Sequence, residues 1–149
     1  MGTVQSSYLD TIPEGYAGAI ANEEPRILIS RTVETVAGIG FGVAVMQGTN
    51  DKGCIISDGT KFLGVTVREQ SVAPSSPSSF ALNDTARIMT EGVIWVANSG
   101  GVAAGDLVEG GAAGVLKKKT GGTAIPNARW ETTADDGDLA QLRLAGGSL

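Results

Sequence analysis

The sequence predicts an all-β protein: a small antiparallel β-barrel or β-sandwich with an extended N-terminal arm. Its 149 residues include 22 glycines and 5 prolines, which interrupt helices but suit turns and bulges. In residues 87–116, short apolar runs are separated by Gly-Asp, Gly-Gly and Asn-Ser-Gly, a pattern typical of strands joined by tight turns. No apolar run approaches ~20 residues, so no membrane-spanning helix is expected.

Residues 1–25 are expected to form the arm, and residues 26–149 the β-barrel domain. Prolines and glycines interrupt any helix in the arm, although it carries spaced apolar residues at Tyr8, Ile12, Tyr16 and Ile20. An apolar segment that cannot fold alone is suited to lie on another surface. An irregular lead-in packed on its own domain explains the pattern equally well.

Strands are expected at residues 27–30, 32–36, 41–46 and 62–68. In residues 41–46, alternation places Phe41, Val43 and Val45 on one face and the smaller neighbours on the other. In residues 62–68, it places Leu63, Val65 and Val67 together. A Ser/Pro-rich loop at residues 70–85 follows, of a kind that a neighbour in an assembly often orders.

The stretch 87–116 is expected to contain several short strands, with turns at residues 98–101 and 109–114. Residues 117–122, which begin with three lysines, favour another polar turn. The chain then closes with a β-hairpin, in which residues 128–132 and 139–144 flank a turn at residues 134–138.

The composition excludes several kinds of chemistry. The sequence contains no histidine, which removes Ser-His and Cys-His nucleophiles and His-bearing zinc sites. The single Cys54 allows no internal disulfide. The net charge is −5 and no basic patch is large enough for a nucleic-acid surface, so binding to nucleic acid is not expected. No catalytic residue, cofactor site or metal site is predicted, and the protein is not expected to be an enzyme.

Two motifs have a structural explanation. Asp135, Asp136 and Asp138 lack the further spaced oxygens of a calcium loop and are explained by a hairpin turn. The Gly-x-Gly-x-Gly run at residues 38–42 lacks the lysine and the following helix of a phosphate loop.

Trp95 and Trp130 are expected in core or interface packing rather than in a sugar-binding platform.

Several stretches together resemble the head-decoration or structural cement proteins of tailed bacteriophages. They are residues 3–24, with P-x-G-x-A-G-x-I-A-N-E-E, residues 30–45, with A-G-I-G-F-G, residues 89–96, MTEGVIWV, and the closing pattern of residues 128–144. The likeness covers nearly the whole chain in order, and none of its motifs is catalytic.

The resemblance implies a β-module on the outer surface of the virion, made in the host cytoplasm and added to an expanded capsid. Such proteins usually form homotrimers, with dimers in related systems, and clamp the shell against DNA pressure where major capsid protein subunits meet. The arm would then contact the capsid through Val4, Tyr8, Ile12, Tyr16 and Ile20. Intersubunit or core packing would involve Phe41, Val93, Trp95 and Trp130. The alternative is a free-standing module that binds carbohydrate on a fibre or cell surface.

Overall fold

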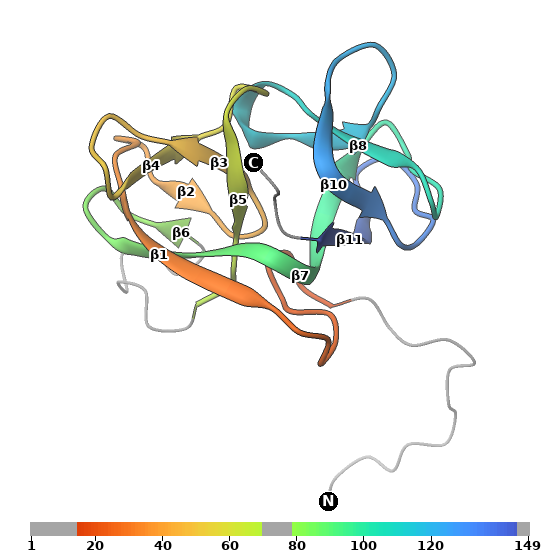
Figure 1. Ribbon diagram of the computed structural model, residues 1–149, viewed down its shortest axis with the longest axis horizontal. Helices are drawn as coiled ribbons and strands as arrows, with labels where there is room; N and C mark the ends of the chain where they lie inside the picture. Colours follow the sequence, from red (N-terminus) through yellow and green to blue (C-terminus); the bar gives the residue numbers. More distant parts are fainter. Residues whose placement is uncertain (1–14, 70–78, 146–149) are drawn as a thin grey trace, which may run out of the picture.

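The computed structural model describes residues 15–69 and 79–145, and this part of the chain is all-β (Figure 1). The predicted all-β class with a barrel is confirmed. A short 3-10 turn, η1 (Ala112–Gly114), is the one helical element among the described residues. The strands are β1 (Ile27–Val33), β2 (Ile39–Gly40), β3 (Ala44–Gln47), β4 (Gly53–Ile56), β5 (Phe62–Thr66), β6 (Ser79–Phe80), β7 (Thr85–Ser99), β8 (Leu107–Gly110), β9 (Leu116–Lys118), β10 (Ala124–Trp130) and β11 (Leu139–Ala145).

The strand pairings form two closed rings that share β7. In the first barrel, the order is β1, β4, β3, β5 and β7, and β7 returns to β1. In the second barrel, the order is β7, β11, β10, β8 and β9, and β9 returns to β7. Each ring has one parallel pair, β1 with β4 and β7 with β9. An odd number of strands requires this, because strands that alternate in direction around a ring match only in even numbers.

Strand β7 runs from one barrel into the other (Figure 1). Its first half pairs with β1 and β5, and its second half pairs with β11 and β9. The expectation of short strands cut by glycine is wrong here, because Gly92 lies inside a single strand of 15 residues. Gly92 has a φ of 130°, and the register with β1 shifts beside it, so that Thr90 is an extra residue opposite Ile27 and Leu28. A bulge and a glycine redirect the strand rather than ending it.

The first barrel encloses a small apolar core. Residues from four of its strands, including Val33, Val45, Cys54 and Ile88, are fully buried there. The two-stranded sheet of β2 and β6 contributes to the same core, where the rings of Phe41 and Phe80 meet edge to face at 5.2 Å. The predicted grouping of Phe41, Val43 and Val45 is correct, since Phe41 and Val45 are buried in this cluster and Val43 packs against it, although β3 begins only at Ala44.

The second barrel encloses Trp130 with Ile94, Val96 and Leu142 in a larger cluster. This cluster continues onto the first barrel through Ala44, Val65, Val67 and Met89. The closing hairpin is as predicted, with Ala128 opposite Leu144 and Trp130 opposite Leu142. Residue alternation along β11 therefore buries Ala140, Leu142 and Leu144 and leaves Gln141 and Arg143 facing outward.

One predicted face is wrong. Leu63 packs in the first-barrel core, whereas Val65 and Val67 belong to the other cluster. The cause is a bulge in β5: Val45 lies opposite Gly64 and Met46 opposite Phe62, which leaves Leu63 as an extra residue. An extra residue reverses the facing of everything beyond it.

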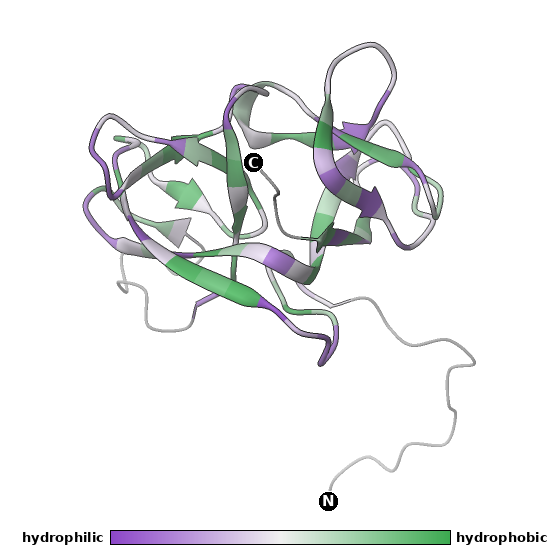
Figure 2. Cartoon of the chain, in the orientation of Figure 1, coloured by the Kyte–Doolittle hydropathy of each residue, from purple (hydrophilic) through white to green (hydrophobic). Residues whose placement is uncertain are grey.

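The hydropathy of the chain follows this arrangement. Figure 2 shows strongly hydrophobic stretches on the strands, with one at the start of β1, and hydrophilic residues gathered in the peripheral turns. The start of β1 is also exposed, because Ile27 leaves 51% of its surface accessible.

Candidate functional site

Residues 18–21, within the predicted arm, are hydrogen-bonded to β7, and we call them the docked segment. The N–H of Gly18 donates to the Trp95 carbonyl at 2.8 Å, and the N–H of Trp95 donates to the Ala19 carbonyl at 2.9 Å. The N–H of Ala21 donates to the Val93 carbonyl at 3.0 Å. This segment thus occupies the stretch of β7 between the part paired with β1 and the part paired with β9.

Small residues permit this close approach. Gly18 has a φ of 81°, and a Cβ atom there would lie 2.9 Å from the backbone nitrogens of Arg68 and Gly42. Gly42 has a φ of 69° and faces Gly18 in the same way. Both positions therefore require glycine for conformation and for space. The segment is locked onto the first barrel by a hydrogen bond from the Arg68 N–H to the Gly18 carbonyl at 2.8 Å.

Arg68 and two aromatic residues form a group that we call the Arg68 stack: Arg68, Tyr16 and Phe41. The guanidinium carbon lies over both rings, 5.1 Å from the centroid of Tyr16 and 5.5 Å from that of Phe41. Both distances fall within the range of cation–π contacts. Phe41 is 8% exposed and belongs to the core, whereas Tyr16 is 71% exposed. The stack therefore extends from the core of the first barrel to its surface.

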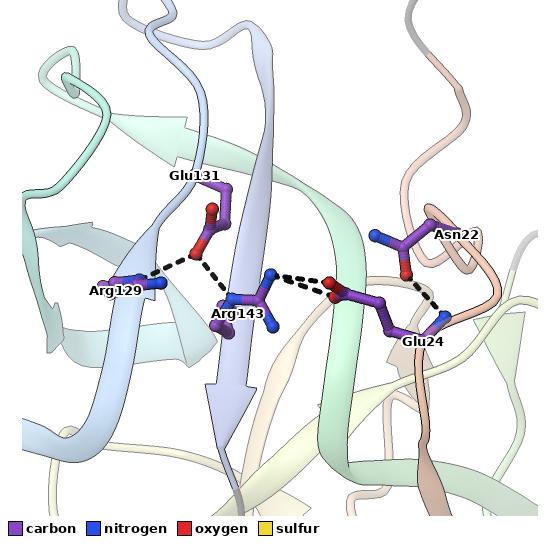
Figure 3. A network of polar contacts seen from close by, with 5 residues as sticks. All are labelled: Asn22, Glu24, Arg129, Glu131 and Arg143. Atoms are coloured by element: carbon purple, nitrogen blue, oxygen red, sulfur yellow. Dashed lines mark hydrogen bonds and ion pairs between the residues drawn. The ribbon is translucent and has the colours of Figure 1, made fainter.

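A network of ion pairs joins the chain beyond the docked segment to the second barrel (Figure 3). Arg143 Nη2 lies 3.0 Å from both carboxylate oxygens of Glu24, and its Nε donates to Glu131 at 2.6 Å. Arg129 Nε donates to the same oxygen of Glu131 at 2.7 Å. Arg129 and Arg143 are direct cross-strand neighbours, so the carboxylate of Glu131 offsets their repulsion.

The network perturbs the protonation of its members. Hydrogen bonding to Arg143 lowers the pKa of Glu24, and hydrogen bonding to Arg129 and Arg143 lowers the pKa of Glu131. The same bonds, first to Glu24 and then to Glu131, raise the pKa of Arg143. All of these charges therefore persist at neutral pH. The network ties the chain just after the docked segment to β11.

The predicted arm residues fall into two groups. Val4, Tyr8 and Ile12 lie outside the described residues. Tyr16 is exposed in the Arg68 stack, while Ile20 is half-buried, packs against the larger core and forms a bridge with Ile94. Their contact with a capsid stays a prediction.

The residues expected in core or intersubunit packing lie mostly inside the molecule. Phe41, Val93 and Trp130 are buried, and Trp130 is 0% exposed. Trp95 is half-buried, with Gly15 lying against its indole. Any part that these residues take in contacts between subunits stays a prediction.

Sequence reasoning missed both the Arg68 stack and the ion-pair network. Arg68 was expected only as the last residue of a strand, and Glu24 and Arg143 are separated by 119 positions. One local signal was present: Arg129, Glu131 and Arg143 have matched positions in the predicted closing hairpin. Alternation alone places these three charged residues on its outer face.

The acidic turn of the closing hairpin is held by hydrogen bonds. The N–H of Asp138 donates to the Asp135 carbonyl, and Asp136 accepts from the N–H of Gly100 at 2.7 Å. Within residues 15–69 and 79–145, no group of three or more His, Cys, Asp or Glu side chains could hold a metal ion. The same part of the chain contains no helix that is long and apolar enough to cross a membrane.

Comparison with known proteins gives one family. A family model described as "Structural cement protein (E217 gp24/Pam3 gp6)" matches residues 4–145. A chain of the solved structure "The capsid of Myoviridae Phage XM1" superposes with a TM-score of 0.69 at 13% identity, covering 95% of this chain and 97% of that chain. This likeness shows a shared fold. No curated protein matches the sequence.

A second solved structure, "The crystal structure of head fiber gp8.5 N base in bacteriophage phi29", superposes with a TM-score of 0.49 at 11% identity. The match covers 84% of this chain and 98% of that chain. At this TM-score the similarity carries no argument.

Proposed function

The chain belongs to the phage structural cement protein family, and from this premise we propose how it acts on a phage capsid. As a member it is a non-enzymatic, structural component of the capsid. In our proposal, it binds the outer surface of the head where major capsid protein subunits meet. There it holds the shell against the pressure of the packaged DNA.

The observation that carries the proposal is the anchoring of the arm. Residues 18–21 are hydrogen-bonded to β7, and Glu24 is ion-paired to Arg143. A contact made by the preceding residues would therefore be transmitted directly to the strand that both barrels share. Residues 4–12 supply the apolar side chains of Val4, Tyr8 and Ile12 for such a contact. An extended arm can add main-chain hydrogen bonds at an exposed sheet edge of the partner.

Multivalency would make such contacts strong. A trimer that touches several capsid subunits at once makes each further contact effectively intramolecular. The combined interface can then reach the ~1,600 Å² typical of stable complexes even if each copy buries little. We therefore propose a homotrimer, with a dimer as the second possibility. Analytical ultracentrifugation of the purified protein tests this point, and a stable monomer would contradict it.

Deletion of residues 1–14 tests the arm. The cut should spare the segment that binds β7, so the truncated protein should stay folded but lose binding to capsids assembled without it. Cosedimentation with those capsids measures binding, and circular dichroism measures folding. A full-length variant with Val4, Tyr8 and Ile12 changed to serine is the matched control for chain length, and it should lose binding as well.

Undiminished capsid binding by both variants would show that the arm is not the contact. A deletion that extends through residue 21 is less informative, because it also removes the hydrogen bonds between residues 18–21 and Val93 and Trp95. Loss of binding after that deletion could reflect loss of the fold.

The carbohydrate alternative gains no support from the described residues. A sugar platform needs a cluster of exposed aromatic rings, but Tyr16 is the one exposed aromatic residue in the described ranges. Phe41, Phe80 and Trp130 are buried in the two cores.

A further inference from the structure

Arg68 differs from the other arginines in what holds its guanidinium, which lies over two aromatic rings. Arg26, Arg87, Arg129 and Arg143 each lie within ion-pair distance of a glutamate, whereas Arg31 and Arg68 have no such partner among residues 15–69 and 79–145. No described carboxylate lies within that distance of Arg68, and the adjacent Glu69 pairs with Arg87 instead. Arg68 is exposed on a protein whose net charge is −5. Within the described ranges, Arg68 is thus an exposed cation without a carboxylate partner, on a protein whose overall charge is negative.

The two residues that hold the guanidinium are themselves anchored, Phe41 through its ring and Tyr16 through its backbone. Phe41 packs edge to face on Phe80 in the core of the first barrel. Tyr16 begins a tight turn in which its carbonyl accepts from the N–H of Ala19 at 2.9 Å. The next residues of this turn include Gly18, which is bonded to Trp95 and Arg68. The aromatic contacts limit the conformations of the Arg68 side chain, so less entropy is lost when it binds a partner.

The chemistry of the site selects a carboxylate. A guanidinium in cation–π contact with aromatic rings still has N–H groups free at its rim, where a carboxylate can accept two parallel hydrogen bonds. Arginine and tyrosine are also enriched among the residues that dominate the energy of protein interfaces. The arrangement therefore suits an acidic side chain of a protein partner.

Its position in the chain indicates which partner. Tyr16 lies two positions after residue 14, so the Arg68 stack lies where the arm meets the first barrel. We propose that Arg68 binds an acidic side chain of the major capsid protein, as a second contact beside the arm. This inference rests on the proposed function, because it assumes that the arm approaches the capsid.

Charge removal at Arg68 tests the inference. Arg68→Gln should weaken binding to capsids assembled without the protein at least ~10-fold, as expected for a central interface residue. Lys119→Gln is the matched control, because it makes the same charge change at an exposed turn of the second barrel. It should change affinity less than ~2-fold. The difference between wild type and Arg68→Gln should shrink at high salt, because salt screens charge attraction.

The aromatic support can be tested separately. Tyr16→Ala should weaken capsid binding several-fold while Arg68 remains present, whereas Tyr16→Phe keeps the ring and should bind like wild type. Thermal unfolding of each variant checks that the fold is retained. If Tyr16→Ala binds as well as wild type, the ring does not prepare Arg68 for binding.

The outcomes separate this inference from the proposed function. If the wild-type protein does not bind capsids, both fail. If wild type binds and Arg68→Gln binds equally well, the inference about Arg68 alone is overturned. If Arg68→Gln changes the oligomeric mass but not the capsid affinity, the carboxylate belongs to a second copy of this chain, and the assignment to the capsid is wrong.

Discussion

The two barrels have the same number of strands and share β7, but they are stabilised in different ways. The first barrel is covered by apolar contacts, with Phe80 of β6 buried against Phe41. The second barrel is held at its end by a buried amide: Asn98 Nδ2 donates to the carbonyls of Asp135 and Asp138 at 2.8 and 2.9 Å. Outside, it carries the ion-pair network of Arg143.

This difference suggests separate roles within one structure. The apolar cover of the first barrel includes Phe41, which also supports the exposed pair of Arg68 and Tyr16. The charges of the network on the second barrel are paired with one another, and they tie the N-terminal region to β11. The first barrel thus presents a group suited to a partner, whereas the second barrel pairs its charges internally and holds Glu24.

Cavity formation in each core gives the largest expected effect. Trp130→Ala in the second barrel and Phe80→Ala in the first should each lower the free energy of unfolding by ~3–5 kcal/mol. Because β7 belongs to both barrels, each variant should unfold in one cooperative transition. Guanidinium unfolding followed by circular dichroism and tryptophan fluorescence measures this.

Two separate transitions, with one of them unaffected by Trp130→Ala, would show that the barrels unfold independently. Trp130→Phe is the matched control, because it keeps a ring in the core. The indole N–H of Trp130 has no hydrogen-bond partner within the described ranges. Its removal should therefore cost no hydrogen bond, and Trp130→Phe should destabilise less than Trp130→Ala.

A side chain at the junction of the barrels should have an intermediate effect. Gly92→Ala places a Cβ atom 2.9 Å from Arg26 Cβ and 3.0 Å from Met89 Sδ, at a φ of 130°. The expected destabilisation is ~1–3 kcal/mol, measured by the same unfolding experiment.

Gly100→Ala, in the turn after β7, is the control that separates the cost of a positive φ from the cost of crowding at Gly92. Its φ is 87°, but a Cβ atom there would meet nothing within 4 Å. It should therefore cost less than Gly92→Ala. If the two substitutions destabilise the protein equally, the close contacts of a Cβ atom at residue 92 do not contribute to the loss of stability.

A pH-dependent effect confined to the second barrel should be the smallest. Glu109 accepts hydrogen bonds from the N–H groups of Thr120 and Gly122 and pairs with Lys117. These bonds, the one from Thr120 most of all, lower the pKa of Glu109 to about 2. A carboxylate with a lowered pKa stabilises the fold fully above its unfolded pKa, here 4.5, and this contribution is lost as the pH falls toward 2.

Glu109→Gln should therefore be less stable than wild type at pH 6, with a gap that narrows between pH 4.5 and 2. Thermal unfolding across this range measures the gap. A gap that stays constant from pH 6 to pH 2 would mean that the charge of Glu109 does not stabilise the turn at residues 119–123.

Local patterns predicted the strands better than their arrangement. Alternation correctly placed Phe41, Val43 and Val45 against one core, although Phe41 and Gly42 form a turn before β3 and Gly42 has a φ of 69°. It failed at Leu63, where a bulge adds a residue without any local signal. The glycine-rich stretch 87–116 was expected to form only short strands, but Gly92 permits the conformation in which β7 passes from one barrel to the other.

The candidate site was predictable only in part. The apolar spacing of the arm indicated Tyr16 as a contact residue, and the structure places it at the surface. Its neighbour Arg68 lies 52 positions away in the sequence, and Arg143 lies 119 positions from Glu24. Such pairs are created by the closure of the barrels, which no pattern within a single segment encodes.

The sharing of β7 also determines when this chain can fold during synthesis. Strand β1 must wait for residues 85–91 before its main antiparallel pairing can form, and residues 18–21 must wait for residues 93–95. The first barrel therefore cannot close on a ribosome that has released only its first 84 residues. Pairings between such distant segments slow folding, because loop closure costs entropy before contacts form.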